Sequence, residues 1–338
     1  MHRTMSQDTL RKLVESYLFY SYPHSVFAFQ GGEPTLAGLP FFEKLVEFQK
    51  RFGRSAQFVS NALQTNGILI DDAWCQFLRQ YQWLVGISMD GNQQMHDTYR
   101  RNRGGEGTWK KVMRGIERMT KHKVDFNVLC VISQTNVHQP EALYEYFQQL
   151  GVEYLQFIPL AEFTPTGQLQ PYAITAQEYG DFLVRLFDRW WPDHQHVRIR
   201  FFDNLAEAVA GYMPGNCVMH ERCESYAVVE YNGDVYPCDF YVEPRWLIGN
   251  LHRDSWNQIA ATDQRLRFAR GKQLPHAECM VCQYQKLCHR GCPAFREKQR
   301  GNPSDLDYFC ATYKRVFDHC LPKLRLEVAK ITGKQPVH

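Results

Sequence analysis

Cysteine spacing in the last third of the chain constrains the fold more than any other feature of the sequence. Eight of the eleven cysteines of this 338-residue chain lie between residues 217 and 310. Four of them form the run Cys279-x2-Cys282-x5-Cys288-x3-Cys292. Cysteines this dense are typical of disulfide frameworks, zinc sites or iron–sulfur clusters, and the spacing alone leaves all three open.

Composition and charge narrow these alternatives. Hydrophobic residues make up 44% of the chain and charged residues 22%, which is ordinary for a globular protein. The net charge of +3 is too small to indicate nucleic acid or an anionic membrane as a partner. The opening residues lead directly into polar sequence without a secretory signal, and no run of 18 apolar residues follows. We therefore expect a cytoplasmic protein, in which structural disulfides are disfavoured and a metal is favoured.

Up to about residue 205 the sequence alternates between strand and helix patterns, after an opening helix predicted over 8–18 with Ser6 as its N-cap. Repeated βα order predicts a parallel sheet or a (β/α) barrel. Such a series normally starts with a strand, so either the fold begins irregularly or a first strand is absent. The predicted strands cover 26–30, 56–61, 83–88, 126–132, 154–159 and 197–202, and the predicted helices cover 40–52, 71–82, 108–121, 140–150 and 175–191.

The pattern changes after residue 205. Two short apolar segments, 227–231 and 234–237, flank Asn232-Gly233, which is a strong hairpin signal. A short helix is predicted near 254–261 and a closing helix over 311–330. Because this region has little apolar core of its own, bound metal would supply part of its stability. We therefore divide the chain into a β/α domain (1–205) and a cysteine-rich domain (206–338).

Polar residues follow the ends of the predicted strands, where a parallel sheet binds its ligands. Turn residues follow strands in any fold, so a single such position carries little weight, whereas the whole set favours a ligand site. The clearest member is Gln30-Gly31-Gly32-Glu33-Pro34, whose glycines let a ligand approach the backbone. Taken alone, this segment is equally an ordinary strand-to-helix turn.

Together with the cysteine array, these motifs resemble the radical S-adenosylmethionine (SAM) enzymes that carry a C-terminal SPASM domain, above all the anaerobic sulfatase-maturating enzymes. The resemblance covers nearly the full chain. It implies an α/β fold: a partial (β/α) TIM-like radical SAM barrel missing its first strand, followed by a cysteine-rich iron–sulfur (SPASM) domain. The matching stretches, besides the eight-cysteine pattern with its Cys238-Asp239 pair, are Phe29-Gln30-Gly31-Gly32-Glu33-Pro34-Thr35-Leu36, Gly86-Ile87-Ser88-Met89-Asp90-Gly91, His96-Asp97-Thr98-Tyr99-Arg100 and Gln156-Phe157-Ile158-Pro159-Leu160.

One defining element of that family does not occur in these 338 residues. Members of the family hold their catalytic cluster with Cys-x3-Cys-x2-Cys. In this chain, the cysteines that precede Cys217 are Cys75 and Cys130, which lie far apart. We therefore expect an N-terminally shortened member that is inactive on its own and that lacks ligands for the SAM-binding cluster. Cys75, Cys130 and Cys320 are interpreted as small buried or surface residues.

The resemblance also implies a SAM pocket. The Gly31-Gly32 backbone is expected to meet the amino group of SAM. The pocket is expected to be completed by Ser88, Arg100 and Leu160. Its lining is expected to include Gln30 and Glu33. The guanidinium of Arg100 is suited to pair with the methionyl carboxylate. A surface arginine within the basic run 100–103 is the alternative interpretation.

Two auxiliary 4Fe–4S clusters would account for all eight cysteines, with four thiolates each. On spacing alone, two four-cysteine zinc sites are the competing interpretation. The resemblance assigns the ligands in two interleaved sets, the first being Cys217, Cys223, Cys238 and Cys292, and the second Cys279, Cys282, Cys288 and Cys310.

The implied reaction is oxidation of a cysteine or serine side chain in a sulfatase polypeptide to formylglycine. A 5′-deoxyadenosyl radical takes a hydrogen from Cβ, a base takes the thiol or hydroxyl proton, and an electron leaves. Asp239 is our candidate for the base; a solvated aspartate after a turn is the alternative. A flavodoxin or ferredoxin is the expected electron donor. Competing functions are another SPASM peptide modification, such as thioether formation, and a non-catalytic iron–sulfur or zinc protein.

Overall fold

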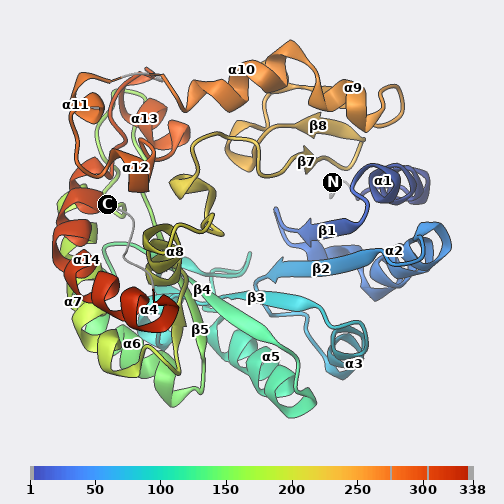
Figure 1. Cartoon of the computed structure of the whole chain (residues 1–338). Helices are drawn as coiled ribbons and strands as arrows, with labels where there is room; N and C mark the ends of the chain where they lie inside the picture. Colours follow the sequence, from blue (N-terminus) through green and yellow to red (C-terminus); the bar gives the residue numbers. More distant parts are fainter. Residues whose placement is uncertain (1–3, 275, 303, 334–338) are drawn as a thin grey trace. The chain divides into compact units, whose positions relative to one another are not determined.

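Strands and helices alternate through the first 209 residues of the computed structural model, which describes residues 4–274, 276–302 and 304–333 (Figure 1). Most predicted elements are found within a few residues of their expected bounds. The elements of this region are α1 (Gln7–Tyr20), β1 (His24–Phe29), η1 (Pro34–Ala37), α2 (Leu39–Phe52), β2 (Phe58–Thr65), α3 (Asp72–Gln80), β3 (Leu84–Ser88), α4 (Gln93–Tyr99), α5 (Trp109–His122), β4 (Phe126–Ile132), α6 (Pro140–Gln149), β5 (Tyr154–Pro159), α7 (Ala176–Trp190), η2 (Trp191–Asp193), β6 (Arg198–Ile199) and α8 (Arg200–Val209).

Six strands form one sheet in sequence order, from β1 to β6. The pairs β1–β2, β4–β5 and β5–β6 are parallel, with Val26 opposite Ser60 and Cys130 opposite Phe157. Parallel neighbours need a crossover between them, and the intervening helices supply it. This topology confirms the predicted α/β class with a partial (β/α) barrel.

Apart from the 23-residue helix α14, the cysteine-rich region is built from short elements. An Asn-Gly turn with Gly233 at φ +85° joins β7 and β8 in an antiparallel pair, which confirms the predicted hairpin. A third strand, β9, pairs antiparallel with β8. The elements are η3 (Cys217–Met219), β7 (Val228–Val229), β8 (Asp234–Tyr236), η4 (Asp239–Tyr241), η5 (Pro244–Trp246), β9 (Gly249–Asn250), α9 (Trp256–Ala260), α10 (Asp263–Gly271), α11 (Ala277–Met280), α12 (Gln285–Cys288), α13 (Pro293–Arg300) and α14 (Cys310–Thr332).

Contacts between residues divide the chain into two units, and each unit takes in parts of both halves of the sequence. Unit 1 runs to Gly86 and includes Arg114–Phe126 and Cys223–Arg270. Unit 2 comprises Ile87–Met113, Asn127–Arg222 and the chain from Gly271 onward. The domain boundary between residues 205 and 206 stays a prediction.

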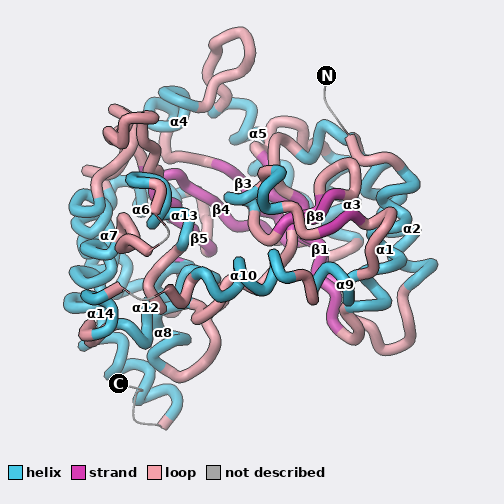
Figure 2. The backbone as a smooth tube through the Cα atoms, turned by 90° about the horizontal axis from the view of Figure 1, so that it is seen from above, coloured by secondary structure: helices cyan, strands magenta, loops and turns pink. Residues whose placement is uncertain are grey.

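In unit 1, α1 and α2 pack on each other beside β1 (Figure 2). The Ser6 hydroxyl accepts a hydrogen bond from the Thr9 backbone and caps α1, as the sequence predicts. The buried face of α1 consists of Thr9, Leu10, Leu13, Val14 and Leu18. Two side-chain bonds fasten α1 to the hairpin region: Thr9 Oγ1 lies 3.1 Å from His252 Nε2, and Trp256 Nε1 donates to Ser16 Oγ at 3.0 Å.

In unit 2, α7 and α14 lie side by side in both Figure 1 and Figure 2. Thr175 and Glu178 form a capping box that starts α7. Gly180 is in the contact: a Cβ placed there would lie 3.1 Å from Arg315 Cδ and 3.5 Å from Thr312 Cα. The missing side chain therefore allows the two helices to approach closely.

The strand predicted over 197–202 is wrong for most of its length. Only Arg198 and Ile199 are in a strand, and α8 begins at Arg200. Phe202, Leu205 and Val209 recur at helical spacing and are buried, so the helical period decides the structure after Ile199. The sequence also did not predict helix α4.

In the part of the chain that the structure describes, no helix has the length and apolar character needed to span a membrane.

Candidate functional site

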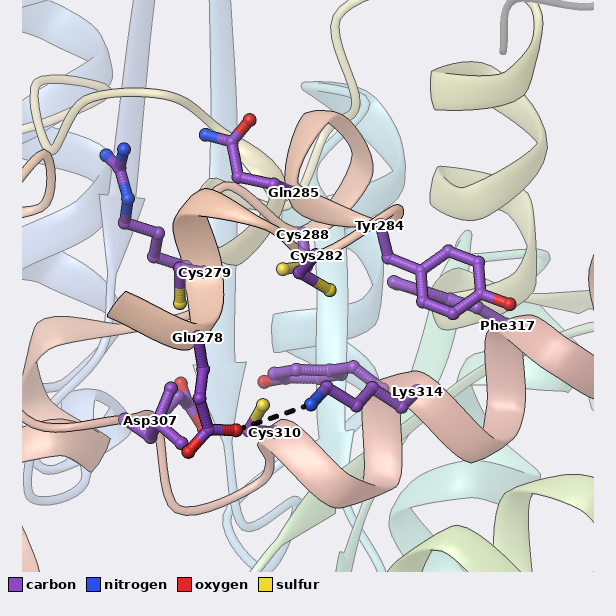
Figure 3. A pocket seen from close by; sticks show the side chains of 13 residues that line it. Glu278, Cys279, Cys282, Tyr284, Gln285, Cys288, Asp307, Cys310, Lys314 and Phe317 are labelled. Atoms are coloured by element: carbon purple, nitrogen blue, oxygen red, sulfur yellow. Dashed lines mark ion pairs between the residues drawn. The ribbon is translucent and has the colours of Figure 1, made fainter. Parts of the chain in front are cut away.

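The four cysteines of the second predicted set line one pocket of unit 2 (Figure 3). Cys279 lies on α11, Cys282 follows that helix, Cys288 ends α12 and Cys310 begins α14. A 4Fe–4S cluster takes one thiolate from each of four cysteines, and this donor set matches that requirement. The residues present therefore fit such a cluster. Among the described residues, no three histidine, cysteine or acidic side chains form a group able to hold a single metal ion.

Burial favours the protonated form of Cys279, Cys288 and Cys310. It raises the pKa of Cys310 to about 11 and raises the pKa values of Cys279 and Cys288 above their usual range. Thiols in such surroundings are protonated at neutral pH, so a metal centre would displace their protons as it binds. Lys314, one turn after Cys310, contributes a positive charge at the pocket wall, and its Nζ lies 3.6 Å from a carboxylate oxygen of Glu278.

A buried carboxylate fixes the loop that carries Cys292. Asp307 accepts the backbone N–H of Cys292 at Oδ2 and that of Phe309 at Oδ1, both at 2.6 Å. Burial raises the pKa of Asp307 to about 6, against the lowering effect of those two bonds. Gly291 makes this close approach possible, because a Cβ there would lie 2.1 Å from Asp307 Oδ2, and its φ of +69° also favours glycine.

The first predicted set of cysteines is distributed over both units. Cys217 and Cys292 belong to unit 2, whereas Cys223 and Cys238 belong to unit 1. In unit 1 the Cys223 N–H donates to Ala269 O at 3.2 Å. Cys238 follows β8, and burial raises the pKa of its thiol to about 12. Among the described residues, no disulfide joins any of the cysteines.

The predicted base, Asp239, has three side-chain partners within unit 1. Gln30 Nε2 donates to Asp239 Oδ2 at 3.0 Å, although the two residues are 209 positions apart in sequence. The Tyr226 hydroxyl donates to Asp239 Oδ1 at 2.7 Å and lies 3.4 Å from Cys238 Sγ. The Cys238 thiol itself donates to Asp239 Oδ1 at 3.3 Å. The carboxylate is thus held on both oxygens, one of them beside a predicted cluster ligand.

Sequence reasoning missed Tyr226. Burial, with Cys238 and Asp239 beside it, raises the pKa of the Tyr226 hydroxyl, which therefore stays a hydrogen-bond donor. The signal that could have found it is the hairpin register. Val228 pairs with Tyr236, so continuing the antiparallel register by two residues sets Tyr226 opposite Cys238.

The Gly31-Gly32-Glu33 segment forms a loop that is braced by Glu33. Both glycines have left-handed backbone angles, with φ +96° and +56°, and no atom lies within 4 Å of a Cβ built on either. Glu33 Oε1 accepts from the Thr35 N–H and hydroxyl and from the Thr65 hydroxyl, at 2.6–3.0 Å. Its Oε2 accepts from the Asn66 N–H at 2.7 Å. The carboxylate of Glu33 is therefore engaged with protein donors.

Of the other predicted SAM residues in unit 2, Ser88 and Leu160 lie at strand ends and Arg100 follows α4. Ser88 ends β3, and Leu160 follows β5, where its N–H donates to Ile132 O at 3.0 Å. Arg100 makes a fork with Asp90: Nε to Oδ2 is 2.6 Å and Nη2 to Oδ1 is 3.0 Å. Asp90 Oδ1 also accepts the Val131 N–H at 2.9 Å. The fork fixes the direction of the Arg100 guanidinium.

His96 links the backbones of Asp90 and Arg100, directly at Asp90 and through Thr108 at Arg100. It is fully buried, its Nδ1 accepts from the Asp90 N–H at 3.3 Å, and its Nε2 lies 3.1 Å from Thr108 Oγ1. The Thr108 hydroxyl donates to Arg100 O, so Nε2 must be the protonated nitrogen. Burial lowers the pKa of His96 to about 4, which keeps the ring neutral.

Known proteins resemble this chain over most of its length. Residues 1–147 match the radical SAM superfamily, and residues 217–283 match SPASM, an iron–sulfur cluster-binding domain. The cysteine-type anaerobic sulfatase-maturating enzyme of Clostridium perfringens (strain 13 / Type A) is 38% identical, over 95% of this chain and 88% of its own length. The serine-type enzyme of Bacteroides thetaiotaomicron is 32% identical, over 98% of this chain and 84% of its own length.

Solved structures of related enzymes also resemble this chain over most of its length. Native anSMEcpe with bound AdoMet and the Cp18Cys peptide superposes with a TM-score of 0.92 at 37% identity, covering 97% of this chain and 92% of that one. Streptococcus suis SuiB, at 11% identity and a TM-score of 0.60, shares the fold. The chain therefore belongs to the radical SAM superfamily with a SPASM domain, within the family of the anaerobic sulfatase-maturating enzymes.

Proposed function

We propose that this protein is a sulfatase maturase, which oxidises a cysteine or serine side chain of a sulfatase polypeptide to formylglycine. The observation that carries this proposal is the Asp239 carboxylate, held by Gln30 and Tyr226 next to the predicted ligand Cys238. The names of the relatives support it, since both cysteine-type and serine-type enzymes are more than 30% identical.

Asp239 acts as the general base in this proposal. Its Oδ2 accepts one bond from a neutral amide and its Oδ1 one from a neutral hydroxyl, so neither partner cancels its negative charge. Because Oδ1 also accepts from the Cys238 thiol, Oδ2 is the oxygen that keeps a further lone-pair direction with which to take a thiol or hydroxyl proton. Bound SAM and its reduced cluster would supply the radical that abstracts hydrogen, and the protein orients the groups and accepts the proton.

For the SAM site we propose that Gly31 and Gly32 present their backbone and that Gln30 and Ser88 line the pocket with Leu160. We propose that Asp90 orients the Arg100 guanidinium and that Arg100 binds the methionyl carboxylate with the N–H groups that do not bond to Asp90. The Glu33 carboxylate is assigned to bracing the loop, because four protein donors surround it.

We propose two auxiliary 4Fe–4S clusters, with the interleaved ligand sets that the family resemblance implies. The pocket lined by Cys279, Cys282, Cys288 and Cys310 supports the second set. Four thiolates from separate segments of the chain can hold the four irons of one cluster. The chemistry that such a cluster would supply is electron transfer. The proposed partners are a sulfatase polypeptide and an electron donor such as flavodoxin or ferredoxin.

The experiment uses the protein expressed from its complete gene and loaded anaerobically with iron and sulfide. It is incubated with SAM, a reductant and a sulfatase-motif peptide, and formylglycine is detected by peptide mass. We expect formylglycine from the wild type and a loss of at least about a hundredfold in Asp239→Asn, which keeps the shape but removes the base. Asp125→Asn, at an exposed position of unit 1, is the control. A thioether product, or full activity of Asp239→Asn, would contradict the proposal.

A further inference from the structure

The ammonium of Lys314 lies at the wall of the pocket that the second set of cysteines lines. Lys314 follows Cys310 by one turn of α14, so the two side chains share one face of that helix. In Figure 3 the ammonium is directed toward Cys310 and Glu278. The four cysteines and Lys314 all belong to unit 2. A positive charge is therefore placed beside four thiols within a single unit.

Glu278 holds this ammonium from a second helix. Its Oε2 lies 3.6 Å from Lys314 Nζ, and Glu278 directly precedes Cys279 on α11. The ion pair thus connects the helices that carry Cys279 and Cys310. The side chains of Lys314 and Glu278 are 43% and 59% exposed, and ion pairs at such exposure contribute little to stability. Stability therefore gives little reason for a lysine at this position.

The charges of Lys314 and of the pocket thiols act on each other. A thiolate at Cys310 favours the ammonium and raises the pKa of Lys314, and a thiolate at Cys282 acts in the same direction. Burial raises the pKa values of Cys310 and Cys279, and the charge of Lys314 opposes that effect at both thiols. The ammonium is therefore close enough to several of the sulfurs to interact with a negative charge that they share.

Other charged groups of the pocket wall have partners of their own. The buried Asp307 carboxylate accepts two backbone N–H groups, and Arg290 Nη1 donates to Gln273 O at 3.1 Å. Lys314 Nζ carries three donors, and at 3.6 Å the Glu278 oxygen lies beyond hydrogen-bond distance. Lys314 is thus the cation of this wall whose donors can turn toward an anionic group in the pocket.

We propose that Lys314 is the charge partner of the 4Fe–4S cluster of the second ligand set, and that its ammonium raises the reduction potential of that cluster. This inference rests on the proposed function and on that ligand set. A cluster held by four thiolates is negatively charged, and reduction by the proposed electron donor adds one electron without breaking a bond. A positive charge beside the cluster stabilises the reduced form more than the oxidised form, because net charge and hydrogen bonds to the sulfurs help to set the potential.

The test is a redox titration, monitored by electron paramagnetic resonance, of the chain reconstituted anaerobically with iron and sulfide. Lys314→Gln removes the charge, whereas Lys314→Arg keeps it. Lys330→Gln is the matched control, because Lys330 lies about four turns further along α14, is 74% exposed and pairs with Glu327. We expect Lys314→Gln to lower the midpoint potential of one of two clusters, with the iron content unchanged. Lys314→Arg and Lys330→Gln should resemble the wild type.

Equal midpoint potentials in Lys314→Gln and the wild type, at equal iron content, would overturn the inference. The same comparison in a Cys238→Ala background, which lacks a ligand of the first set, identifies the cluster. The shift should persist there, and its disappearance would also overturn the inference.

Where Lys314→Gln fails to keep one cluster, Lys314→Arg decides. Retention by the arginine variant supports a charge requirement, and loss in both variants shows a requirement for the lysine shape and overturns the inference. Failure of the proposed function is visible separately, because the wild type would then contain zinc or far less than about eight iron per chain.

Discussion

At the scale of single residues, the carboxylate of Asp239 owes its orientation to two neutral donors from different parts of unit 1. Gln30 follows β1 and Tyr226 precedes β7, and each donor holds one oxygen. A base that must meet a substrate proton at one position benefits from such restraint, because free rotation would spread the carboxylate over several rotamers.

Tyr226→Phe removes the hydroxyl that donates to Asp239 Oδ1 at 2.7 Å and keeps the ring. We expect kcat for formylglycine formation to fall on the order of tenfold, as for other supporting bonds to reactive groups. KM for the peptide should change little. The measurement is initial rates over a range of peptide concentrations with the protein expressed from its complete gene.

Tyr212→Phe serves as the control for that variant, because Tyr212 is 61% exposed and lies in unit 2. An unchanged kcat in Tyr226→Phe would show that Gln30 alone orients Asp239. A fall in iron content would instead point to a role of Tyr226 in holding Cys238, whose sulfur lies 3.4 Å from its hydroxyl.

The neutral state of His96 makes stability depend on pH. The folded pKa of about 4 lies below the ordinary value of 6.5, so the folded state disfavours the protonated ring. The resulting stabilisation is fully present above pH 6.5 and is lost as the pH falls toward 4. Between pH 7.5 and 5.5 the unfolding free energy should fall by about 1 kcal/mol through this group.

The measurement compares urea unfolding of the wild type and His96→Gln at those two pH values. The variant cannot titrate at this position, so the stability difference between the two proteins should shrink at pH 5.5. A difference that is independent of pH would show that His96 titrates alike in the folded and unfolded chains.

Residue types at the candidate site were predictable from sequence, but their partners were not. The eight cysteines and Asp239 are recognisable from spacing and from the family motifs. The four donors that surround the Glu33 carboxylate come from η1 and from the end of β2 and the residue after it, and the sequence did not indicate them. The fork between Arg100 and Asp90 likewise depends on how α4 follows β3. Such pairings depend on loop geometry, which sequence periodicity does not encode.

At the scale of elements, the pairing of α7 with α14 positions the first residue of α14, Cys310. Thr312 donates its hydroxyl to Ala176 O at 2.5 Å, and His319 Nε2 lies 2.8 Å from Asp188 Oδ1. Gly180 lies in the contact near Thr312. The place of the Cys310 thiol in its pocket therefore depends on how closely these helices approach.

Gly180→Leu should force the two helices apart. The new side chain would start from a Cβ only 3.1 Å from Arg315 Cδ, and overpacking of this kind costs about 1–3 kcal/mol. We expect a lower urea midpoint and reduced iron content. Gln177→Leu, at an exposed position of the same helix, is the control. Equal midpoints for the two variants would show that the contact tolerates added volume.

Elements with a strong and unbroken period were predicted well, and short ones were not. β4 and β5 have their predicted bounds because their apolar runs end at clear turns. The stretch after Val197 combines a β-branched start with apolar residues at helical spacing, and the helical period prevails from Arg200 onward. Helix α4 has only 7 residues, too few to show a period, and it begins at the Asn92 cap.

At the scale of the whole molecule, the cysteine ligand sets are interleaved in sequence. Cys288 and Cys292 are four residues apart, yet the proposal assigns them to different clusters. Cys238 and Cys292 are 54 residues apart, yet it assigns them to the same one. Sets drawn in simple sequence order would instead place Cys288 and Cys292 together. Double variants distinguish these arrangements. Two substitutions within one ligand set remove one cluster, whereas one substitution in each set removes both clusters.

We expect Cys238→Ala/Cys292→Ala to retain about four iron per chain and Cys288→Ala/Cys292→Ala to retain almost none, against about eight in the wild type. Iron and zinc are measured together after anaerobic reconstitution, with Cys75→Ala as the control, since Cys75 is buried on α3. The reverse order of the two double variants would support sequential sets. Zinc in place of iron throughout would instead favour structural zinc sites, because tetrahedral four-cysteine zinc has the same ligands.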